Sequence, residues 1–505
     1  GNPPYVQIQK FSAAHKAAWM AQDFKTYGAT ADIYCLFYER GVRLLKSGGH
    51  LSFITSNKWM RAGYGEKLRQ YLAKDVATQS VMDFGMAQNF GAATTYTCIV
   101  QLTKRPIFGP IRTCYVADDK AAMANPRDYF EKNAVPVTDL DESPWVVMSP
   151  ERFRIKQVVE KQGVRLDKWA VQINYGIKTG YNEAFYISTE QRDDFIAQDP
   201  RCEDLIVPLL RGRYVDRYAT QWALAEDEKW MIKTLPALDL KLSSLPNPIR
   251  QHLKKYREAL EPKPSDWRGT SWQGRKSGTY QWFETQDPII YHADFKKTKI
   301  IYPNMTKYLP FYLDTAEHFF INDKAFILTS ETESLAYLTA ALNSTLFRCC
   351  FRDNFPELLG NTYEVRKIFM DTIPIKKPTA TQATVFDTLV PLVQAAKASA
   401  QNQKLAGKKF EFENAGAFLE QVIDACVMEV YFADHMAEKR LGLLAHVVPL
   451  LASVKLQASQ AKLAQAALDF VATANDSKHP IRNILIRIPA DSPDLLAVIQ
   501  REGKV

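Results

Sequence analysis

The first hundred residues alternate between helical and strand patterns, and this alternation restricts the fold more than any other feature of the sequence. Apolar side chains recur at helical spacing over residues 31–46 and again over 66–72. Residues 50–55, 80–84 and 95–102 are rich in strand-forming side chains. Strands that alternate with helices predict an α/β unit with a partly parallel sheet.

Changes of pattern divide the 505 residues into four parts. Prolines recur between residues 104 and 150, so we expect the α/β unit to cover 1–105 and a connecting segment to cover 106–150. Residues 151–377 mix strands, turns and aromatic side chains, which predicts an α+β domain. Residues 378–505 show helical periodicity and are expected to form a helical C-terminal module.

Composition argues against several classes of protein. Seven cysteines without a Cys-x-x-Cys pair are too few for a disulfide scaffold and form no zinc motif, so a reducing, cytoplasmic location is expected. The longest apolar stretch, from Leu441 to Val454, is too short to cross a bilayer, so no membrane partner is expected. The chain opens on Gly rather than Met, with no signal peptide, as if cut from a longer protein.

Positive charge is concentrated in one part of the chain. The net charge is +8, from 64 Lys and Arg against 56 Asp and Glu. Residues 251–310 alone contain eleven Lys or Arg and six acidic residues, interleaved with ten aromatic side chains. This combination is typical of a surface that binds phosphates and stacks on bases, and it fits equally well a solvated basic face over an aromatic core.

The tetrapeptide Asn2-Pro3-Pro4-Tyr5 carries the clearest chemistry. Its two prolines stiffen the backbone and present carbonyl oxygens without competing N–H groups. The Asn2 side-chain oxygen and the Pro3 carbonyl can accept the two N–H bonds of an exocyclic amine, while the Tyr5 ring stacks on the attached base. Such bonds would draw the nitrogen toward tetrahedral geometry and free its lone pair to attack a methyl donor. A proline turn beside a buried tyrosine is the alternative interpretation.

In its context, the tetrapeptide resembles the catalytic motif of the N6-adenine DNA methyltransferases. That context is the helix and strand described above, followed by the segment Asn89-Phe90-Gly91-Ala92-Ala93-Thr94-Thr95-Tyr96-Thr97-Cys98-Ile99-Val100. The resemblance implies the C-terminal half of a Rossmann-like class I methyltransferase domain over residues 1–105, with Asn2, Pro3, Pro4 and Tyr5 as catalytic residues. It also implies that a flipped adenine stacks between Tyr5 and Phe90, and that S-adenosylmethionine donates the methyl group without a metal.

Later segments resemble the target-recognition domain of type IIG restriction-modification enzymes and related phage-defence methyltransferases. They are Ile-Asn-Tyr-Gly-Ile-Lys-Thr-Gly-Tyr-Asn-Glu-Ala-Phe at 173–185, Val-Pro-Leu-Leu-Arg-Gly-Arg-Tyr at 207–214, and the shorter segments 341–344 and 373–375. The segment 418–424 resembles the helical end of these proteins. The resemblance implies that residues 151–377 read double-stranded DNA in a prokaryotic cytoplasm. The candidate DNA contacts are Lys178, Arg211, Arg213, Arg275 and Lys297.

One departure from this family limits the expected activity. In the family, a Gly-rich turn and an acidic residue that precede the motif build most of the S-adenosylmethionine pocket, and the sequence contains neither, which leaves Asn2 and Pro3 facing the cofactor. We therefore expect an N-terminally truncated methyltransferase, inactive alone, whose partner is the missing half of the fold. Two alternatives stay open: a DNA-recognition fragment or subunit without activity, and a bifunctional restriction endonuclease-methyltransferase whose nuclease lies outside this chain.

Overall fold

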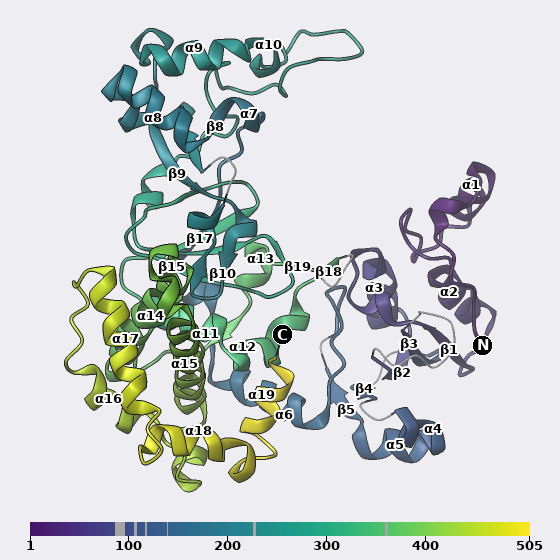
Figure 1. Ribbon diagram of the computed structural model, residues 1–505. Coiled ribbons are helices and arrows are strands. Elements are labelled where there is room, and N and C mark those ends of the chain that lie inside the picture. The colour runs from purple at the N-terminus through teal and green to yellow at the C-terminus, as the bar shows by residue number, and fades with distance from the viewer. Residues whose placement is uncertain are drawn as a thin grey trace. The chain divides into compact units, whose positions relative to one another are not determined.

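The computed structural model describes residues 1–85, 96–105, 109–116, 119–138, 140–225, 229–358 and 362–504. The chain divides into two compact units, each assembled from separate stretches of sequence (Figure 1). Unit 1 consists of Gly1–Lys161, Cys349–Glu364 and Val498–Glu502, and unit 2 consists of Gln162–Arg348, Val365–Ala497 and Gly503–Val505. We describe each unit by itself.

A five-stranded sheet forms the centre of unit 1, in the order β1-β3-β2-β4-β5. Its strands are β1 (His50–Ser56), β2 (Ala77–Asp83), β3 (Thr97–Thr103), β4 (Ile111–Tyr115) and β5 (Val135–Val137). β3 is antiparallel to both β1 and β2, whereas β2 and β4 are parallel. Residues expected to form a partly parallel α/β sheet therefore do so.

Helices and 3-10 helices lie before, between and after these strands along the chain. They are α1 (Ala13–Ala21), α2 (Tyr34–Leu44), α3 (Glu66–Lys74), α4 (Asp119–Ala124), α5 (Pro126–Asn133) and α6 (Pro150–Gln162), with 3-10 helices at Ile8–Lys10, Asn57–Met60, Gly63–Gly65 and Arg352–Asn354 and a small β18 (Glu357–Leu358) and β19 (Thr362–Glu364) hairpin. α2 buries Tyr34, Leu36 and Tyr38 in a core that also contains Val100 of β3. Burial of this apolar face holds α2 against the sheet.

Residues 106–150, which we expected only to connect two domains, contribute to the sheet of unit 1. β4 pairs with β2 in parallel, and β5 pairs with β4 in antiparallel fashion. Unit 1 continues to Lys161 and takes in two later segments.

Two four-stranded sheets organise unit 2. One has the order β15-β13-β17-β7 and the other β16-β9-β12-β8. The strands of the unit are β6 (Val164–Arg165), β7 (Val171–Tyr175), β8 (Tyr186–Ile187), β9 (Ile206–Leu210), β10 (Val215–Asp216), β11 (Ala219–Thr220), β12 (Trp230–Ile232), β13 (Lys299–Pro303), β14 (Met305–Thr306), β15 (Tyr312–Asp314), β16 (Phe320–Ile321), β17 (Ala325–Ser330) and β20 (Pro374–Ile375). A buried cluster that includes Phe185, Leu210, Phe295 and Ile327 lies among these elements.

The helices of unit 2 gather at its two ends. α7 (Asn182–Phe185), α8 (Thr189–Gln198), α9 (Asn247–Lys255) and α10 (Arg257–Leu260) lie at one end, and the helices after α13 lie at the other (Figure 1). The other helices of unit 2 are α11 (Leu335–Asn343), α13 (Lys367–Met370), α14 (Ala380–Gln401), α15 (Lys409–Glu438), α16 (Leu444–Leu451), α17 (Gln460–Ala474) and α18 (Pro480–Asp491). Two more helices, α12 (Thr345–Phe351) and α19 (Leu496–Glu502), each contain residues of both units. The remaining 3-10 helices are Leu166–Lys168, Pro200–Leu205, Gly212–Tyr214, Trp222–Leu224, Pro236–Leu238, Leu242–Ser244, His292–Lys296 and Gln403–Lys408.

The C-terminal helices were expected to form a separate module from residue 378, and they are helical as expected. α14 begins with a capping box between Thr379 and Gln382, and its apolar residues pack against α15. Residues 365–497 nevertheless belong to unit 2 together with the strands, so the helical part completes that unit. Among the described residues, no helix is both long and apolar enough to span a bilayer.

Candidate active site

The tetrapeptide Asn2-Pro3-Pro4-Tyr5 begins beside strand β1. The amino group of Gly1 donates to the carbonyl of Ser52 at 2.7 Å, and the amide of Ile54 donates to the carbonyl of Gly1 at 2.9 Å. These two bonds follow the pattern of parallel strands, so the chain runs along β1 before it enters the tetrapeptide. Tyr5 then lies near the C-terminal end of β1.

The Tyr5 hydroxyl connects the tetrapeptide to itself and to β1. Its oxygen lies 2.9 Å from the Asn2 side-chain oxygen and 3.2 Å from the carbonyl of Ile54, and it donates its single proton toward these acceptors. Asn2 is exposed, Pro3 is buried and Tyr5 is half-buried. The buried proline and the tyrosine thus fix the backbone while the Asn2 amide remains accessible.

Two further tyrosines support the Tyr5 ring. Tyr34 of α2 packs edge-on against it, with 5.8 Å between the ring centroids, and the Tyr34 hydroxyl bonds that of Tyr64 at 2.9 Å. Burial raises the pKa of Tyr5 and raises that of Tyr34 still further. All three phenols therefore stay neutral near pH 7. Sequence reasoning missed Tyr34 and Tyr64, because neither belongs to a recognisable motif.

Just after Tyr5, residues 6–8 pair with residues 31–33 through backbone hydrogen bonds. The amide of Ile8 donates to Ala31 at 2.8 Å, the amide of Ile33 donates to Val6 at 2.9 Å, and Gln7 and Asp32 form a β-bridge. Residues 9–30, including α1, connect the two paired segments. The position of Tyr5 is therefore fixed independently of that connection.

At the end of β2, a buried carboxylate organises the backbone. Asp83 accepts bonds from the Asn57 side-chain amide at 2.8 Å and from the Gly85 amide at 3.0 Å. Burial raises the pKa of Asp83. The predicted stacking residue Phe90 follows in the sequence but lies outside the described residues, so its predicted role stays a prediction.

The sequence contains one Gly-x-Gly, Gly63-Tyr64-Gly65, which forms a 3-10 turn. A Cβ on Gly65 would lie 2.0 Å from the carbonyl oxygen of Trp59, whereas a Cβ on Gly63 would meet no atom within 4 Å. Close packing against Trp59 therefore accounts for the glycine at position 65. No group of His, Cys, Asp or Glu that could hold a metal occurs among the described residues.

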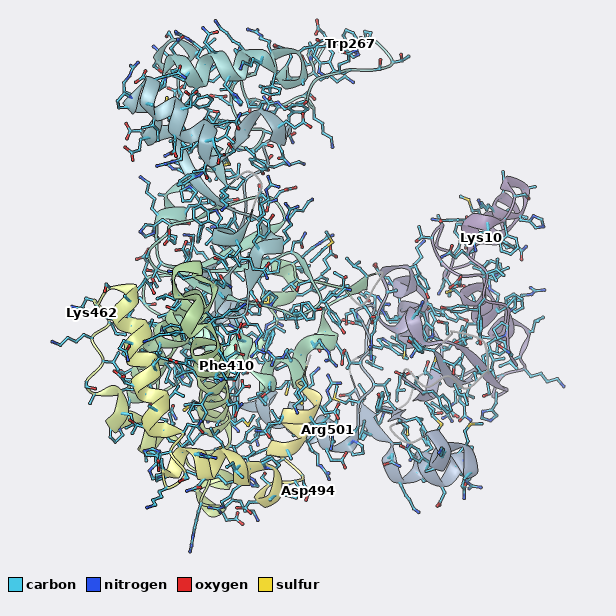
Figure 2. All side chains as sticks on the ribbon, in the orientation of Figure 1. Lys10, Trp267, Phe410, Lys462, Asp494 and Arg501 are labelled. Carbon is cyan, nitrogen blue, oxygen red and sulfur yellow. The ribbon has the colours of Figure 1, made fainter. Side chains whose placement is uncertain are left out.

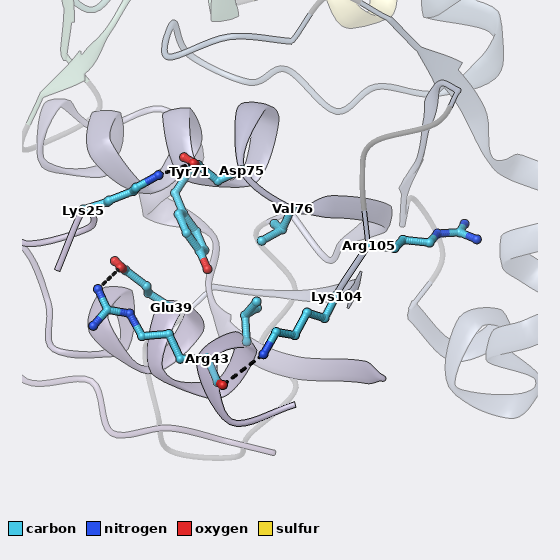
Figure 3. Close-up of a pocket in the computed structure, with 9 residues that line it drawn as sticks. Lys25, Glu39, Arg43, Tyr71, Asp75, Val76, Lys104 and Arg105 are labelled. Atoms are coloured by element: carbon cyan, nitrogen blue, oxygen red, sulfur yellow. Dashed lines mark hydrogen bonds and ion pairs between the residues drawn. The ribbon is translucent and has the colours of Figure 1, made fainter. Parts of the chain in front are cut away.

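Unit 1 also contains a cavity of about 610 Å³ at the other end of the sheet (Figure 3). It is lined by Lys25, Glu39, Val42, Arg43, Tyr71, Asp75, Val76, Lys104 and Arg105. His50 at the start of β1 pairs with Thr103, so Lys104 lies opposite the end that carries Tyr5. Lys25 pairs with Asp75 and Arg43 pairs with Glu39, which neutralises two of its cations. This cavity is therefore separate from the tetrapeptide.

The five residues predicted to contact DNA have different surroundings in unit 2. Lys178 and Arg213 are exposed, whereas Arg211 is half-buried with its guanidinium 5.0 Å from the Tyr186 ring centroid. Lys297 is exposed but pairs with Glu331 at 2.7 Å and Asp294 at 3.1 Å, and the hydrogen bond to Glu331 raises its pKa most. Its charge is thus largely balanced within the protein.

Arg275 does not fit the predicted contact with DNA. Its residue is 4% exposed, and its guanidinium donates only to backbone carbonyls of the same unit. A buried guanidinium that is saturated by carbonyls cannot reach a phosphate. The sequence could not show this, because the five acceptors come from three separate stretches of chain.

Comparison with known families assigns two parts of the chain. Residues 1–90, which include the tetrapeptide, match the family described as Eco57I restriction-modification methylase, and residues 207–375 match the family described as TaqI-like C-terminal specificity domain. The chain combines an Eco57I-type methylase segment with a TaqI-like specificity domain. The resemblance inferred from the sequence is confirmed at this level.

Type II methyltransferases are among the relatives of this chain. The chain is 26% identical over 209 residues to the type II methyltransferase M.XhoI of Xanthomonas vasicola, covering 37% of this chain and 36% of that one. It is 28% identical over 198 residues to the type II restriction enzyme and methyltransferase RM.Eco57I of Escherichia coli, covering 38% of this chain and 20% of that one. The match therefore spans about a third or less of the length of these relatives.

Two solved structures resemble the chain over most of its length. The type IIL restriction-modification enzyme MmeI in complex with DNA aligns with 85% of this chain and 54% of that one, at 14% identity and a TM-score of 0.48. The type IIG restriction endonuclease BpuSI aligns with 85% of this chain and 53% of that one, at 12% identity and a TM-score of 0.35.

Proposed function

We propose that this chain holds the target adenine of a restriction-modification DNA methyltransferase, which transfers a methyl group from S-adenosylmethionine to the N6 amine of a flipped base. The observation that carries the proposal is the Asn2–Tyr5 arrangement, within a segment that matches a restriction-modification methylase family. The specificity domain is proposed to read double-stranded DNA around that adenine.

The tetrapeptide has the acceptors that an exocyclic amine needs. A side-chain amide oxygen has two lone pairs, and the Tyr5 hydroxyl uses one on Asn2, so the other is available to an incoming N–H. The Pro3 carbonyl is proposed to accept the second N–H. Both bonds would polarise the adenine nitrogen, whose lone pair is otherwise delocalised into the ring. On the cofactor side, Asn2 and Pro3 are the residues of this chain proposed to face the methyl donor.

The half-buried Tyr5 ring is proposed to stack on the flipped adenine. Unstacking a base from the duplex costs a few kcal/mol, and stacking on an aromatic ring offsets part of that cost. The edge-on contact with Tyr34 would keep the Tyr5 ring from rotating away while the base enters. Phe90 is proposed to cover the opposite face of the base.

Replacing Asn2 with Ala tests the proposal in the complete gene product. Asn2→Ala is expected to abolish transfer of a tritiated methyl group to DNA while leaving duplex affinity nearly unchanged. Gln7→Ala removes an exposed amide close by in the sequence and should methylate normally. Mass spectrometry of digested DNA identifies the product, and either normal methylation by Asn2→Ala or a product other than N6-methyladenine would contradict the proposal.

A second candidate function is recognition of DNA without catalysis by this chain. The match of residues 207–375 to a specificity-domain family favours it, because that segment supports recognition without itself implying methyl transfer. Calorimetry with S-adenosylmethionine separates the two candidates. Micromolar binding to the 505-residue chain would contradict the recognition-only function.

A further inference from the structure

A closed loop extends from the end of unit 2 that carries α8 to α10. Its neck is formed where Pro262 bridges Arg275, where the amide of Arg275 donates to Glu261 at 3.0 Å, and where the amide of Lys263 donates back to Arg275 at 3.0 Å. Residues 263–274, here called the Trp267 loop, lie beyond this neck. Figure 2 shows Trp267 near the free end of the loop.

The loop holds an exposed tryptophan in a fixed orientation. Trp267 is 39% exposed, and its ring meets that of Trp272 edge-on, with 5.1 Å between centroids. Trp272 is anchored by a bond from its indole N–H to the carbonyl of Glu261 at 3.1 Å. Gly269 lets the backbone pass against the Trp267 ring, because a Cβ there would lie 2.4 Å from Cζ2 of that ring. A large apolar side chain is thus ordered although it covers no core.

Basic residues flank this tryptophan in the sequence. Lys263, Arg268 and Lys276 are exposed, and Asp266 is the acidic residue in the same stretch. A rigid aromatic ring between cations is the arrangement that inserts at a base step while its neighbours contact the flanking phosphates. Duplex DNA is therefore the partner whose chemistry fits this surface.

Arg275 holds the neck of the loop in place. Its Nε donates to Leu260 at 2.8 Å, one terminal nitrogen donates to Thr179 and Glu284 at 2.7 Å each, and the other donates to Trp282 at 3.0 Å and Gln281 at 3.3 Å. Burial lowers the pKa of Arg275 to about 10, which still leaves it charged at neutral pH. One side chain thus ties α10, the 179–182 turn and the 281–284 segment together.

We propose that the Trp267 loop is a DNA wedge in which Trp267 stacks on a base step and Arg268 contacts an adjacent phosphate, and that Arg275 is the positioning residue that orients this loop. The inference rests on the proposed function, since it assumes that unit 2 binds DNA. To that function it adds the Trp267 loop as the element that contacts DNA, and Arg275 as a residue that orients the loop without touching DNA.

Substitutions at Trp267 test the stacking contact in the 505-residue chain. With a fluorescein-labelled duplex of mixed sequence, Trp267→Ala should weaken binding about ten-fold, whereas Trp267→Phe should bind nearly as wild type. Both should lose the part of the DNA-induced quenching of tryptophan fluorescence that Trp267 supplies. Phe410→Ala removes another exposed aromatic ring of unit 2, in α15, and should change neither quantity (Figure 2). Wild-type affinity and quenching in Trp267→Ala would overturn the wedge.

Salt dependence tests the phosphate contact. Arg268→Gln should reduce the slope of log affinity against log salt by about 0.9, the value for one phosphate contact, whereas Trp267→Ala should leave the slope unchanged. Lys462→Gln removes an exposed cation from α17 and serves as the charge control (Figure 2). An unchanged slope in Arg268→Gln would overturn the assigned phosphate contact.

The positioning role of Arg275 predicts a different result from a direct contact. Arg275→Lys keeps the charge and loses the planar set of donors, so it should weaken binding and reduce Trp267 quenching. In the Arg268→Gln background, where the loop's phosphate contact is already absent, Arg275→Lys should not lower the salt slope further. A further fall of the slope in that double variant, or wild-type affinity and quenching in Arg275→Lys, would overturn that role. If the 505-residue chain bound no duplex at all, the DNA-binding part of the proposed function would fail too, whereas binding that ignores Trp267 would overturn the wedge alone.

Discussion

The Tyr5 hydroxyl donates a hydrogen bond to the Asn2 side-chain oxygen over 2.9 Å, so the two polar side chains of the tetrapeptide orient each other. Tyr5→Phe keeps the ring and removes this bond, which is worth about 1 kcal/mol. We expect methyl transfer by the complete gene product to slow about five-fold in single-turnover assays, with DNA affinity unchanged. Tyr5→Ala also removes the ring and should weaken both. Equal rates for Tyr5→Phe and wild type would show that Asn2 is oriented by other contacts.

A buried ion pair ties the Cys349–Glu364 segment into unit 1, and removing it should destabilise that unit. Asp353 accepts from Arg152 at 2.7 Å, and Arg61 lies 3.8 Å away. Asp353→Asn leaves buried guanidinium charge uncompensated, so we expect a loss of about 3 kcal/mol in the free energy of unfolding of unit 1, measured in urea. Asp75→Asn, which breaks the exposed pair with Lys25, should cost less than about 1 kcal/mol. Equal losses for the two variants would contradict this.

The same carboxylate gives a prediction for pH. Burial acts to raise the pKa of Asp353, but Arg152 and Arg61 outweigh it and hold that pKa well below the usual range. A depressed pKa contributes stability that is fully present above the unfolded value of about 4 and is lost as the pH falls through the folded value. The stability difference between wild type and Asp353→Asn should therefore be constant from pH 7 to about 5 and shrink below pH 4. A stability difference that increased as the pH fell would contradict a lowered pKa of Asp353 in the folded protein.

A second buried pair lies inside unit 2, between Lys299 and Asp314 at 2.7 Å, and neither side chain is exposed. Asp314 also accepts from the amides of His318 and Phe319. Lys299→Met removes the cation and leaves the carboxylate buried, so we expect a loss of about 3 kcal/mol. Lys324→Met, which breaks an exposed pair with Asp323, is the control and should have little effect on thermal unfolding. A similar small effect for Lys299→Met would mean that Asp314 is satisfied by the two amides alone.

Exposed lysines of unit 2 should differ in their contribution to DNA binding. Lys178 is exposed in the turn that follows β7, whereas Lys297 is held by Glu331 and Asp294. We expect Lys178→Gln to lower the salt slope of duplex binding by about 0.9 and Lys297→Gln to leave it unchanged. The reverse order would mean that DNA displaces the two carboxylates from Lys297.

Local patterns predicted the α/β character of the first hundred residues well. α2, β1 and α3 appear where periodicity placed them, because each buries one apolar face in the same core. The strands within 106–150 were missed because their prolines look like linker residues. Pro136 lies in β5, the edge strand of the sheet, where a missing N–H breaks no inter-strand bond on the solvent side.

Only the part of the site that lies in one contiguous motif could be predicted from the sequence. Asn2 and Tyr5 lie three residues apart in one tetrapeptide, so their shared chemistry could be predicted from the sequence. Tyr34 reaches Tyr5, and Tyr64 reaches Tyr34, only through folding. The burial of Arg275 could not be predicted, because charge alone does not distinguish a phosphate ligand from a donor to buried carbonyls, and one of its acceptors, the carbonyl of Thr179, lies 96 residues away in the sequence.

The division of unit 1 over three stretches of chain has a consequence for synthesis. Val498–Glu502 belong to the same unit as the tetrapeptide at the N-terminus. During synthesis, Asn2 and Tyr5 leave the ribosome before Val498–Glu502 do, so their unit can be completed only after Glu502 has been added to the chain. A product that stops before Val498 would therefore contain every residue of the tetrapeptide and lack part of the unit that carries it.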